Sequence, residues 1–220
     1  TGAGGGIVFL PVFTLLGLSV TESRATTMAL PWFGMAGGGR WWLRHVEKGG
    51  LTEKGRAVVR RMEELGMVVD IAHCSHACVA DILSMSRRPV VSSHGGVQAT
   101  CDVNRNLTDQ EIRGVAKTGG VIGIGYWDGA VCGTSPRDTA RAMKHVRDLV
   151  GIEHVALGSD YDGAVTVRFD TSQLVQVTQA LMDEGFTEDE IRAAMGENAL
   201  RVLREDLEPL RMSVDSVPVP

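Results

Sequence analysis

The stretch VVDIAHCSH, residues 68–76, is the best guide to the fold of the whole chain. It begins with an apolar run that is typical of a buried strand and ends with two histidines, three residues apart. Two other strand-like runs end in a similar way. PVVSSHGG, residues 89–96, places His94 just past its strand, and HVALGSDYDG, residues 154–163, places Asp160 just past another. Polar side chains at several strand ends are typical of a (β/α) barrel, which collects its chemistry at the carboxyl ends of different strands.

Strands and helices alternate from residue 51 onward. We expect four strands, at about residues 67–72, 88–93, 121–126 and 154–159. We expect helices at about residues 51–66, 75–85, 108–120 and 136–150, with two more closing the chain. Thr52 is the expected N-cap of the first helix, and two capping boxes are expected, Thr108 with Glu111 and Thr187 with Glu190.

The strands are continuous apolar runs, which indicates parallel strands buried on both faces. A doubly wound sheet also fits the alternation, but it usually has a Gly-rich phosphate turn after one strand. The Gly-rich TGAGGG, residues 1–6, precedes an apolar run instead. The sequence therefore predicts an α/β fold, a TIM-type (β/α) barrel, of which four βα units lie between residues 51 and about 180.

Composition excludes some classes of protein. The 220 residues suit one domain or two small ones, and 44% apolar with 22% charged residues is ordinary for a globular protein. A net charge of −5 without a basic stripe argues against a nucleic-acid binder. The four cysteines include no CxxC pair, so buried or free thiols are the preferred interpretation; Cys101 and Cys132 could form a bridge if they meet in space.

Residues 1–45 differ from the rest of the chain. Residues 1–21 carry no charge, and the apolar run at residues 7–20 is interrupted by Pro11 and Gly17. It lacks the basic start of a signal peptide and is short for a membrane span, so a buried helix or strand is preferred. We therefore expect residues 1–45 to be a diverged apolar segment and residues 46–220 to be the C-terminal half of a barrel. A cytoplasmic location is favoured over membrane association.

The polar strand ends suggest a metal site. His73 and His94 lie 21 residues apart, about one βα unit, so they should be neighbours on adjacent strands. Imidazoles are natural zinc ligands, and the Asp160 carboxylate could hold or deprotonate a metal-bound water. Arg105, in the loop after His94, could clamp a substrate carboxylate, although a solvated loop arginine is an equal alternative. His76 is more simply a surface residue.

Several segments closely resemble the membrane dipeptidase (renal dipeptidase-like) family, zinc metallopeptidases of the amidohydrolase superfamily. The resemblance extends over about residues 46–203 and is carried by GGLTEKGRAVVRRMEELGMVVDIAHCSH, RPVVSSHGG, CDVNRNLTD, GGVIGIGYWDGAVCG and HVALGSDYDGA. It implies that His73 and His94 bind one zinc, that Asp160 handles the proton of the catalytic water, and that Arg105 grips the C-terminal carboxylate of a dipeptide. Cys101 and Cys132 also fall where some family members carry a disulfide.

The sequence departs from this family in its N-terminal part. Family sites hold two zincs, using a His-x-Asp pair and a bridging glutamate, but no His-x-Asp precedes His73 and Gly4 stands in the glutamate's place. A Thr-His pair that contacts substrate in the family corresponds to Thr21 and Glu22. A full barrel takes roughly 250 residues, so the chain is expected to be a fragment or a truncated relative, with ligands evident for one zinc.

We therefore expect zinc-dependent hydrolysis of dipeptides, impaired by the missing ligands. The alternatives are a non-catalytic remnant of a dipeptidase and a mononuclear amidohydrolase that acts on another amide or a lactone. A dipeptide is the expected substrate, and the sequence leaves a homodimer open.

Overall fold

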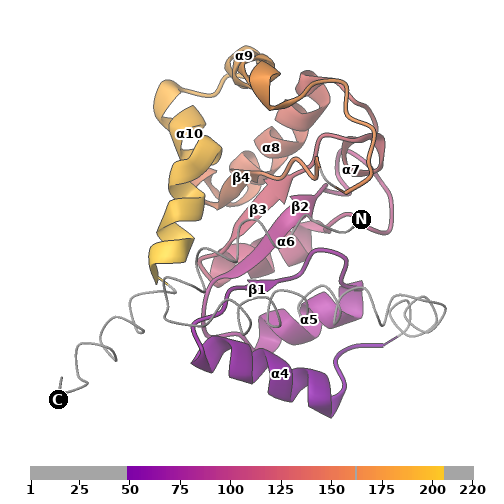
Figure 1. Ribbon diagram of the computed structural model, residues 1–220, viewed down its shortest axis with the longest axis vertical. Coiled ribbons are helices and arrows are strands. Elements are labelled where there is room, and N and C mark those ends of the chain that lie inside the picture. The colour runs from indigo at the N-terminus through magenta and orange to yellow at the C-terminus, as the bar shows by residue number, and fades with distance from the viewer. Residues whose placement is uncertain (1–48, 162, 206–220) are drawn as a thin grey trace, which may run out of the picture. The chain divides into compact units, whose positions relative to one another are not determined.

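The structure is a computed structural model that describes residues 49–161 and 163–205 (Figure 1). The chain divides into two compact units, and residues 50–161 and 165–205 belong to the larger one. The expected N-terminal segment, residues 1–45, lies outside the described residues, as do Gly4, Glu22, His45 and Asp162.

A parallel sheet lies at the centre of the larger unit. Its four strands are β1 (Val69–Asp70), β2 (Val90–Gly95), β3 (Val121–Ile124) and β4 (Val155–Leu157). They pair in the order β1-β2-β3-β4, which is also their order in the chain. Each strand therefore lies beside the next, as a (β/α) barrel requires. Three of the strands fall within the ranges that the sequence predicts, and β2 extends two residues past its predicted end.

Helices connect the strands and close the unit. The structure places the longer ones at α4 (Glu53–Glu64), α5 (His76–Met85), α6 (Asp109–Lys117), α8 (Pro136–Val150) and α9 (Val175–Asp183). The short ones are α7 (Asp128–Val131), α10 (Glu188–Arg192), the 3-10 turns η1 (Ile152–His154) and η2 (Thr171–Gln173), and a π-helical turn η3 (Ala193–Glu197). In Figure 1, α4 and α5 lie on the β1 side of the sheet, and α8 and α10 lie on the β4 side.

Local sequence signals explain where these helices begin. The Thr52 side chain accepts a hydrogen bond from the amide of Gly55, and both expected capping boxes, at Thr108 and Thr187, are present. Ser135 forms a further capping box with Asp138 at the start of α8. No helix among the described residues is both long enough and apolar enough to cross a membrane.

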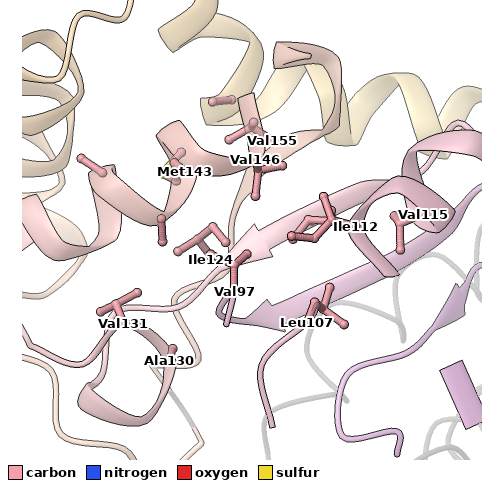
Figure 2. Close-up of a cluster of buried hydrophobic side chains, with 14 of the residues drawn as sticks. Val97, Leu107, Ile112, Val115, Ile124, Ala130, Val131, Met143, Val146 and Val155 are labelled. Carbon is pink, nitrogen blue, oxygen red and sulfur yellow. The ribbon is translucent and has the colours of Figure 1, made fainter. Parts of the chain in front are cut away.

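The core forms where β2, β3 and β4 pack against α6 and α8 (Figure 2). Ile124 and Val155 on the sheet meet Ile112 of α6 and Met143 of α8, and all four side chains are fully buried. Val121, on the other face of β3, packs instead with Ala156 and Val202. The strand β3 is therefore buried on both faces, as its continuous apolar run predicts.

A disulfide joins Cys101 to Cys132, with the two Cα atoms 5.2 Å apart. The preferred interpretation of four free or buried thiols is therefore wrong for this pair, while Cys74 and Cys78 are free. The helix α7 is not predicted from the sequence, from which only a Gly-containing loop is expected here, and this helix is the reason for the error. Cys132 caps α7 in a left-handed conformation, φ 51°, which ends that helix beside the loop that carries Cys101.

Candidate metal and substrate site

Two imidazoles meet at the carboxyl ends of β1 and β2. Nε2 of His73 lies 2.8 Å from Nε2 of His94, and the rings are inclined by 62° to each other. His73 follows β1 by three residues and His94 is the fifth residue of β2. The pairing of adjacent parallel strands brings the two side chains together, although 21 residues separate them in the chain.

Two of the expected site residues have an unusual backbone. His73 has φ 65° and Asp160 has φ 56°, in the left-handed region that residues with a Cβ seldom occupy. Such a conformation costs on the order of 1–3 kcal/mol, and it is concentrated at functional sites in proteins generally. In both cases the left-handed residue follows a strand, so the backbone turns sharply where the side chain is presented.

Asp70 fixes the turn that carries His73. Its Oδ1 accepts hydrogen bonds from the amides of Ala72 and Ser93, each at 3.0 Å. One carboxylate oxygen thus joins the residue before His73 to the residue before His94. This connection holds the two histidine-bearing segments in register at the edge of the sheet.

The hydroxyl of Ser93 orients the ring of His94. Ser93 Oγ lies 2.8 Å from Nδ1 of His94. When Nδ1 carries the proton and donates it to Ser93, Nε2 keeps its lone pair. That tautomer leaves the nitrogen that faces His73 available as a metal ligand.

Arg105 lies beside the histidine pair, with Nη2 3.4 Å from Nε2 of His73. Its guanidinium also stacks on the ring of Trp127, with Cζ 4.9 Å from the ring centre, and this ring lies 6.2 Å from that of His94. The ring of Trp127 therefore helps to hold the cation beside the histidine pair.

Electrostatics favours a neutral histidine beside a charged arginine. Burial, followed by the charges of Arg105 and His94, lowers the pKa of His73, against the opposing effect of Asp160 and Asp70. Burial also lowers the pKa of Arg105, and the carboxylate of Asp160 opposes that change. Asp160 is half-buried and close enough for its charge to act on both groups.

The histidine pair fits part of a zinc site. Two imidazole nitrogens bound to one tetrahedral zinc, at about 2.0–2.1 Å each, lie about 3.3 Å apart. The two Nε2 atoms here are 2.8 Å apart, so the rings would separate slightly to bind the same ion. A zinc site normally has at least three protein ligands. Within residues 49–161 and 163–205, however, no group of three or more histidine, cysteine, aspartate or glutamate side chains is placed to hold a metal ion. Two imidazole nitrogens, those of His73 and His94, are thus the candidate ligands among the described residues.

The other histidines have structural contacts. Nδ1 of His76 lies 2.7 Å from Oε1 of Glu111, so this residue links α5 to α6 and does not support His73. His145 contacts Asp109 at 2.7 Å, and His154 contacts the carbonyl of Gly120 at 2.7 Å.

Sequence reasoning missed three residues of this site, namely Asp70, Ser93 and Trp127. Asp70 and Ser93 are the polar residues nearest the two histidines on their strands, and Trp127 follows the third strand as the histidines follow theirs. Their position at strand ends was the available signal.

A small pocket opens in the segment after β4, with a volume of about 300 Å³. It is lined by Tyr161, Val165, Val167, Arg168, Phe169, Asp170 and Gln173. Tyr161 follows Asp160 directly and packs edge-on against Tyr126, with ring centres 5.6 Å apart. The volume is at the lower end of the range of small-molecule sites, about 300–1,000 Å³.

Comparison with known proteins gives a consistent result. A family model described as membrane dipeptidase (peptidase family M19) matches residues 26–212. Among curated proteins, "Dipeptidase aclJ" of Aspergillus oryzae is 32% identical over 179 residues, which is 78% of this chain and 42% of that protein. The chain therefore spans about half the length of the relatives that it matches.

Solved structures agree with the fold. A metallopeptidase from Rhodobacter sphaeroides, liganded with a phosphinate mimic of the dipeptide L-Ala-D-Ala, has a TM-score of 0.68 at 27% identity. The match covers 72% of this chain and 48% of that one. A dipeptidase of family M19 gives a TM-score of 0.67 at the same identity and the same coverage. The predicted α/β fold of the (β/α) barrel type, of which the described residues contain four strands, is confirmed by these neighbours.

Proposed function

Because the chain belongs to the membrane dipeptidase family, peptidase family M19, we propose that its strand-end site serves the metal-dependent hydrolysis of dipeptides. The observation that carries this proposal is the convergence of His73 and His94, whose Nε2 atoms lie 2.8 Å apart beside the guanidinium of Arg105. Two imidazole nitrogens next to a cation suit a site that handles a metal and an anionic substrate together.

We assign one zinc ion to the histidine pair. When bound, zinc polarises the scissile carbonyl and lowers the pKa of a coordinated water. His73 and His94 would each bind through Nε2, with Ser93 holding the ring of His94 and Asp70 holding the turn of His73. Further protein donors would come from outside the described residues, either from other parts of this chain or from a second copy of it.

Arg105 and Asp160 have separate roles in this proposal. Arg105 would bind the C-terminal carboxylate of the dipeptide through two parallel hydrogen bonds, from a guanidinium already positioned on Trp127. Asp160 would accept the proton of the attacking water on a carboxylate oxygen and pass it to the leaving amine. Asp160 lies close enough to Arg105 for its charge to raise the pKa of the guanidinium, against the opposing effect of burial.

The test is a hydrolysis assay with L-Ala-D-Ala and added zinc. Each measurement is paired with the C-terminal amide of the same dipeptide, which lacks the carboxylate that Arg105 would bind. We expect hydrolysis of the free dipeptide that exceeds hydrolysis of the amide and that is lost in Asp160→Asn. Equal rates on the two substrates would remove the role of Arg105, and activity that survives in Asp160→Asn would remove that of Asp160.

A second candidate function is metal binding without turnover. The observation that favours it is that no group of three or more histidine, cysteine, aspartate or glutamate side chains in the described part of the chain is placed to hold a metal ion. The two functions are separated by measuring zinc and turnover on the same sample. Zinc that is retained by the pair, with no hydrolysis of any of a panel of dipeptides, would establish the second function.

A further inference from the structure

The residue that follows Arg105 is a fully buried asparagine. Asn106 is 1% exposed, whereas Arg105 itself is half-buried. The amide Nδ2 of Asn106 donates to the carbonyl of Cys101 and to that of Ala130, each at 2.9 Å. Both partners are carbonyl oxygens, so both protons of the amide are used and its orientation is fixed. Its Oδ1 has no partner among the described residues, so the contribution of this side chain comes from its two donors.

The bond to Ala130 connects Arg105 with the aromatic ring on which it stacks. Trp127 is the N-cap of α7, and its carbonyl accepts a hydrogen bond from the amide of Ala130 at 3.0 Å. Trp127 and Ala130 are therefore held in one helical turn, just as Arg105 and Asn106 are held together as neighbours in the chain. The hydrogen bond from Asn106 to Ala130 thus restrains the guanidinium relative to the indole, where Arg105 Cζ lies 4.9 Å from the ring centre.

Close packing around this contact leaves little room for movement. A Cβ atom at Gly96 would clash with the carbonyl oxygen of Ala130 and would come within 2.8 Å of Nδ2 of Asn106. A Cβ atom at Gly95 would lie 3.3 Å from Nη1 of Arg105. These two glycines stand at the end of β2 and directly after it, so the strand that carries the second histidine packs against both the amide and the guanidinium.

A disulfide ties the same two segments at a second point. Cys101, whose carbonyl accepts from Asn106, is bonded to Cys132, the residue that ends α7. A single link between two segments permits rotation about that link, and a second link at a separate point removes this freedom. The disulfide and the Asn106 amide together therefore fix both the distance and the orientation of the Arg105 segment relative to α7.

We propose that Asn106 is a positioning residue for Arg105: its amide bridge to Cys101 and Ala130 holds the guanidinium over Trp127 and thereby gives the site its selectivity for ligands with a free carboxylate. This selectivity rests on the proposed function, whereas the placement of the guanidinium does not depend on it. Two parallel hydrogen bonds to a carboxylate need the guanidinium plane in a defined orientation. A misplacement of about 1 Å in a binding group can cost roughly a hundredfold in rate.

The first experiment determines the position of Arg105 without substrate or metal. The full chain, with its disulfide intact, carries isotope-labelled arginine for NMR, and the signals of Arg105 are assigned by their loss in Arg105→Lys. Because the guanidinium lies over the ring of Trp127, the ring current should shift its Nε–H and δ-methylene protons upfield. We expect Asn106→Ala to move these signals toward the values of a solvated arginine.

Asn198→Ala is the matched control. Asn198 is also a buried asparagine, and its Nδ2 donates to the carbonyls of Ile152 and Val155 at 2.7 and 2.8 Å. These carbonyls lie at the amino end of β4, whereas the candidate site lies at the carboxyl ends of the strands. The control therefore loses two hydrogen bonds of the same kind and should leave the Arg105 signals in place. Unchanged Arg105 signals in folded Asn106→Ala, or equal changes in the two alanine variants, would overturn the proposal.

Asn106→Ser provides a milder variant in case Asn106→Ala does not fold. A hydroxyl has one proton and can donate to only one carbonyl at a time, so the serine also breaks the bridge between Cys101 and Ala130. We expect a smaller shift of the Arg105 signals in the same direction. Signals that stay where they are in the unsubstituted chain would again overturn the positioning role.

The second experiment measures the selectivity itself. Calorimetric titration with L-Ala-D-Ala and with its C-terminal amide, in the presence of zinc, gives the ratio of the two affinities. We expect Asn106→Ala to reduce this ratio by roughly tenfold or more and Asn198→Ala to leave it unchanged.

A double variant shows whether Asn106 acts through Arg105. In an Arg105→Lys background, Asn106→Ala should not reduce the affinity ratio further, because the residue that it positions is already gone. A further reduction of the same size would overturn the proposal. If the unsubstituted chain binds neither ligand, the proposed function and the selectivity both fail, and the NMR signals of Arg105 still decide whether Asn106 positions the guanidinium.

Discussion

His73 combines two features that a single residue seldom has, a left-handed backbone and a ring nitrogen in direct contact with a second imidazole. Contacts from neighbouring residues offset the backbone strain. The chief ones are the hydrogen bonds that Asp70 accepts from the amides of Ala72 and Ser93. Strain of this kind persists only when the surrounding structure holds it in place. The geometry of the histidine pair is therefore a property of the strand ends together.

Substitution of either histidine should remove metal binding. We expect His73→Ala and His94→Ala each to lose zinc, because one imidazole alone is a weak site. His145→Ala is the matched control, since that ring contacts Asp109 on the surface, away from the pair. Metal content after dialysis measures the effect. Equal zinc in the three variants would place the metal elsewhere.

Arg105 should control binding of a free carboxylate. We expect Arg105→Lys to weaken binding of a dipeptide by roughly ten- to a hundredfold, because a lysine cannot make two parallel hydrogen bonds and a bond to a charged group contributes about 1.5–3 kcal/mol. Binding of the matching dipeptide amide should change little. Calorimetric titration of both ligands measures this, and an equal loss for the two would show that Arg105 acts by packing on Trp127.

The elements that carry this site differ in how well the sequence predicts them. The four strands and the capping boxes at Thr108 and Thr187 were predictable, because apolar runs and capping residues act locally. The short helix α7 was not, since four residues carry too little periodicity to be recognised. The disulfide depends on α7, so the contact between Cys101 and Cys132 could be inferred only from resemblance.

The Cys101–Cys132 disulfide should contribute substantially to stability. It closes a segment between residues 31 apart, for which loop-closure entropy predicts about 3–4 kcal/mol. We expect Cys132→Ser to lower the free energy of unfolding by this order, as measured by urea denaturation. The reduced unsubstituted chain is the control and should match the variant; a variant as stable as the oxidised chain would contradict the expectation.

The start of α4 should become less stable in acid. The hydrogen bond from Arg56, followed by that from the amide of Leu51, lowers the pKa of Asp81. A carboxyl group whose pKa is lower in the folded than in the unfolded state stabilises the folded state at a pH above its unfolded pKa, about 3.9. This contribution is lost as the pH falls through the pKa of the folded state. We expect Asp81→Asn to destabilise the chain near pH 6, and the difference to shrink below about pH 4.

Urea denaturation at the two pH values measures this difference. Asp183→Asn is a suitable control, because that carboxylate contacts only Gln179 in the described structure. A deficit of Asp81→Asn that stays constant down to the lowest pH would rule out the ion pair as its source.

The described residues contain four parallel strands, half of the eight in a complete barrel. They also bring together two histidines, the proposed ligands, and no larger group of side chains that could hold a metal. We predict that the purified chain holds fewer than two zinc ions per molecule. Elemental analysis across a range of protein concentrations checks this, and two tightly held ions at every concentration would contradict it.

The concentration series also identifies the source of the remaining donors. Zinc content that rises with protein concentration, together with a doubling of mass in sedimentation, would indicate a second copy of the chain. Zinc content that stays constant in a monomer would point to residues of the same chain outside the described ranges, 1–48, 162 or 206–220.

The match between strand order and chain order also affects how the chain folds as it is synthesised. Paired positions such as Val69 with Val90, Val91 with Val121, and Ile122 with Val155 lie only 21, 30 and 33 residues apart. Each strand can therefore dock on its predecessor as soon as it leaves the ribosome, with a modest loop-closure cost at every step. In folding of this kind, the first βα unit can form before the last one has been synthesised. Nascent chains arrested after β3 should accordingly protect the β1–β2 amides from hydrogen exchange before β4 has been translated.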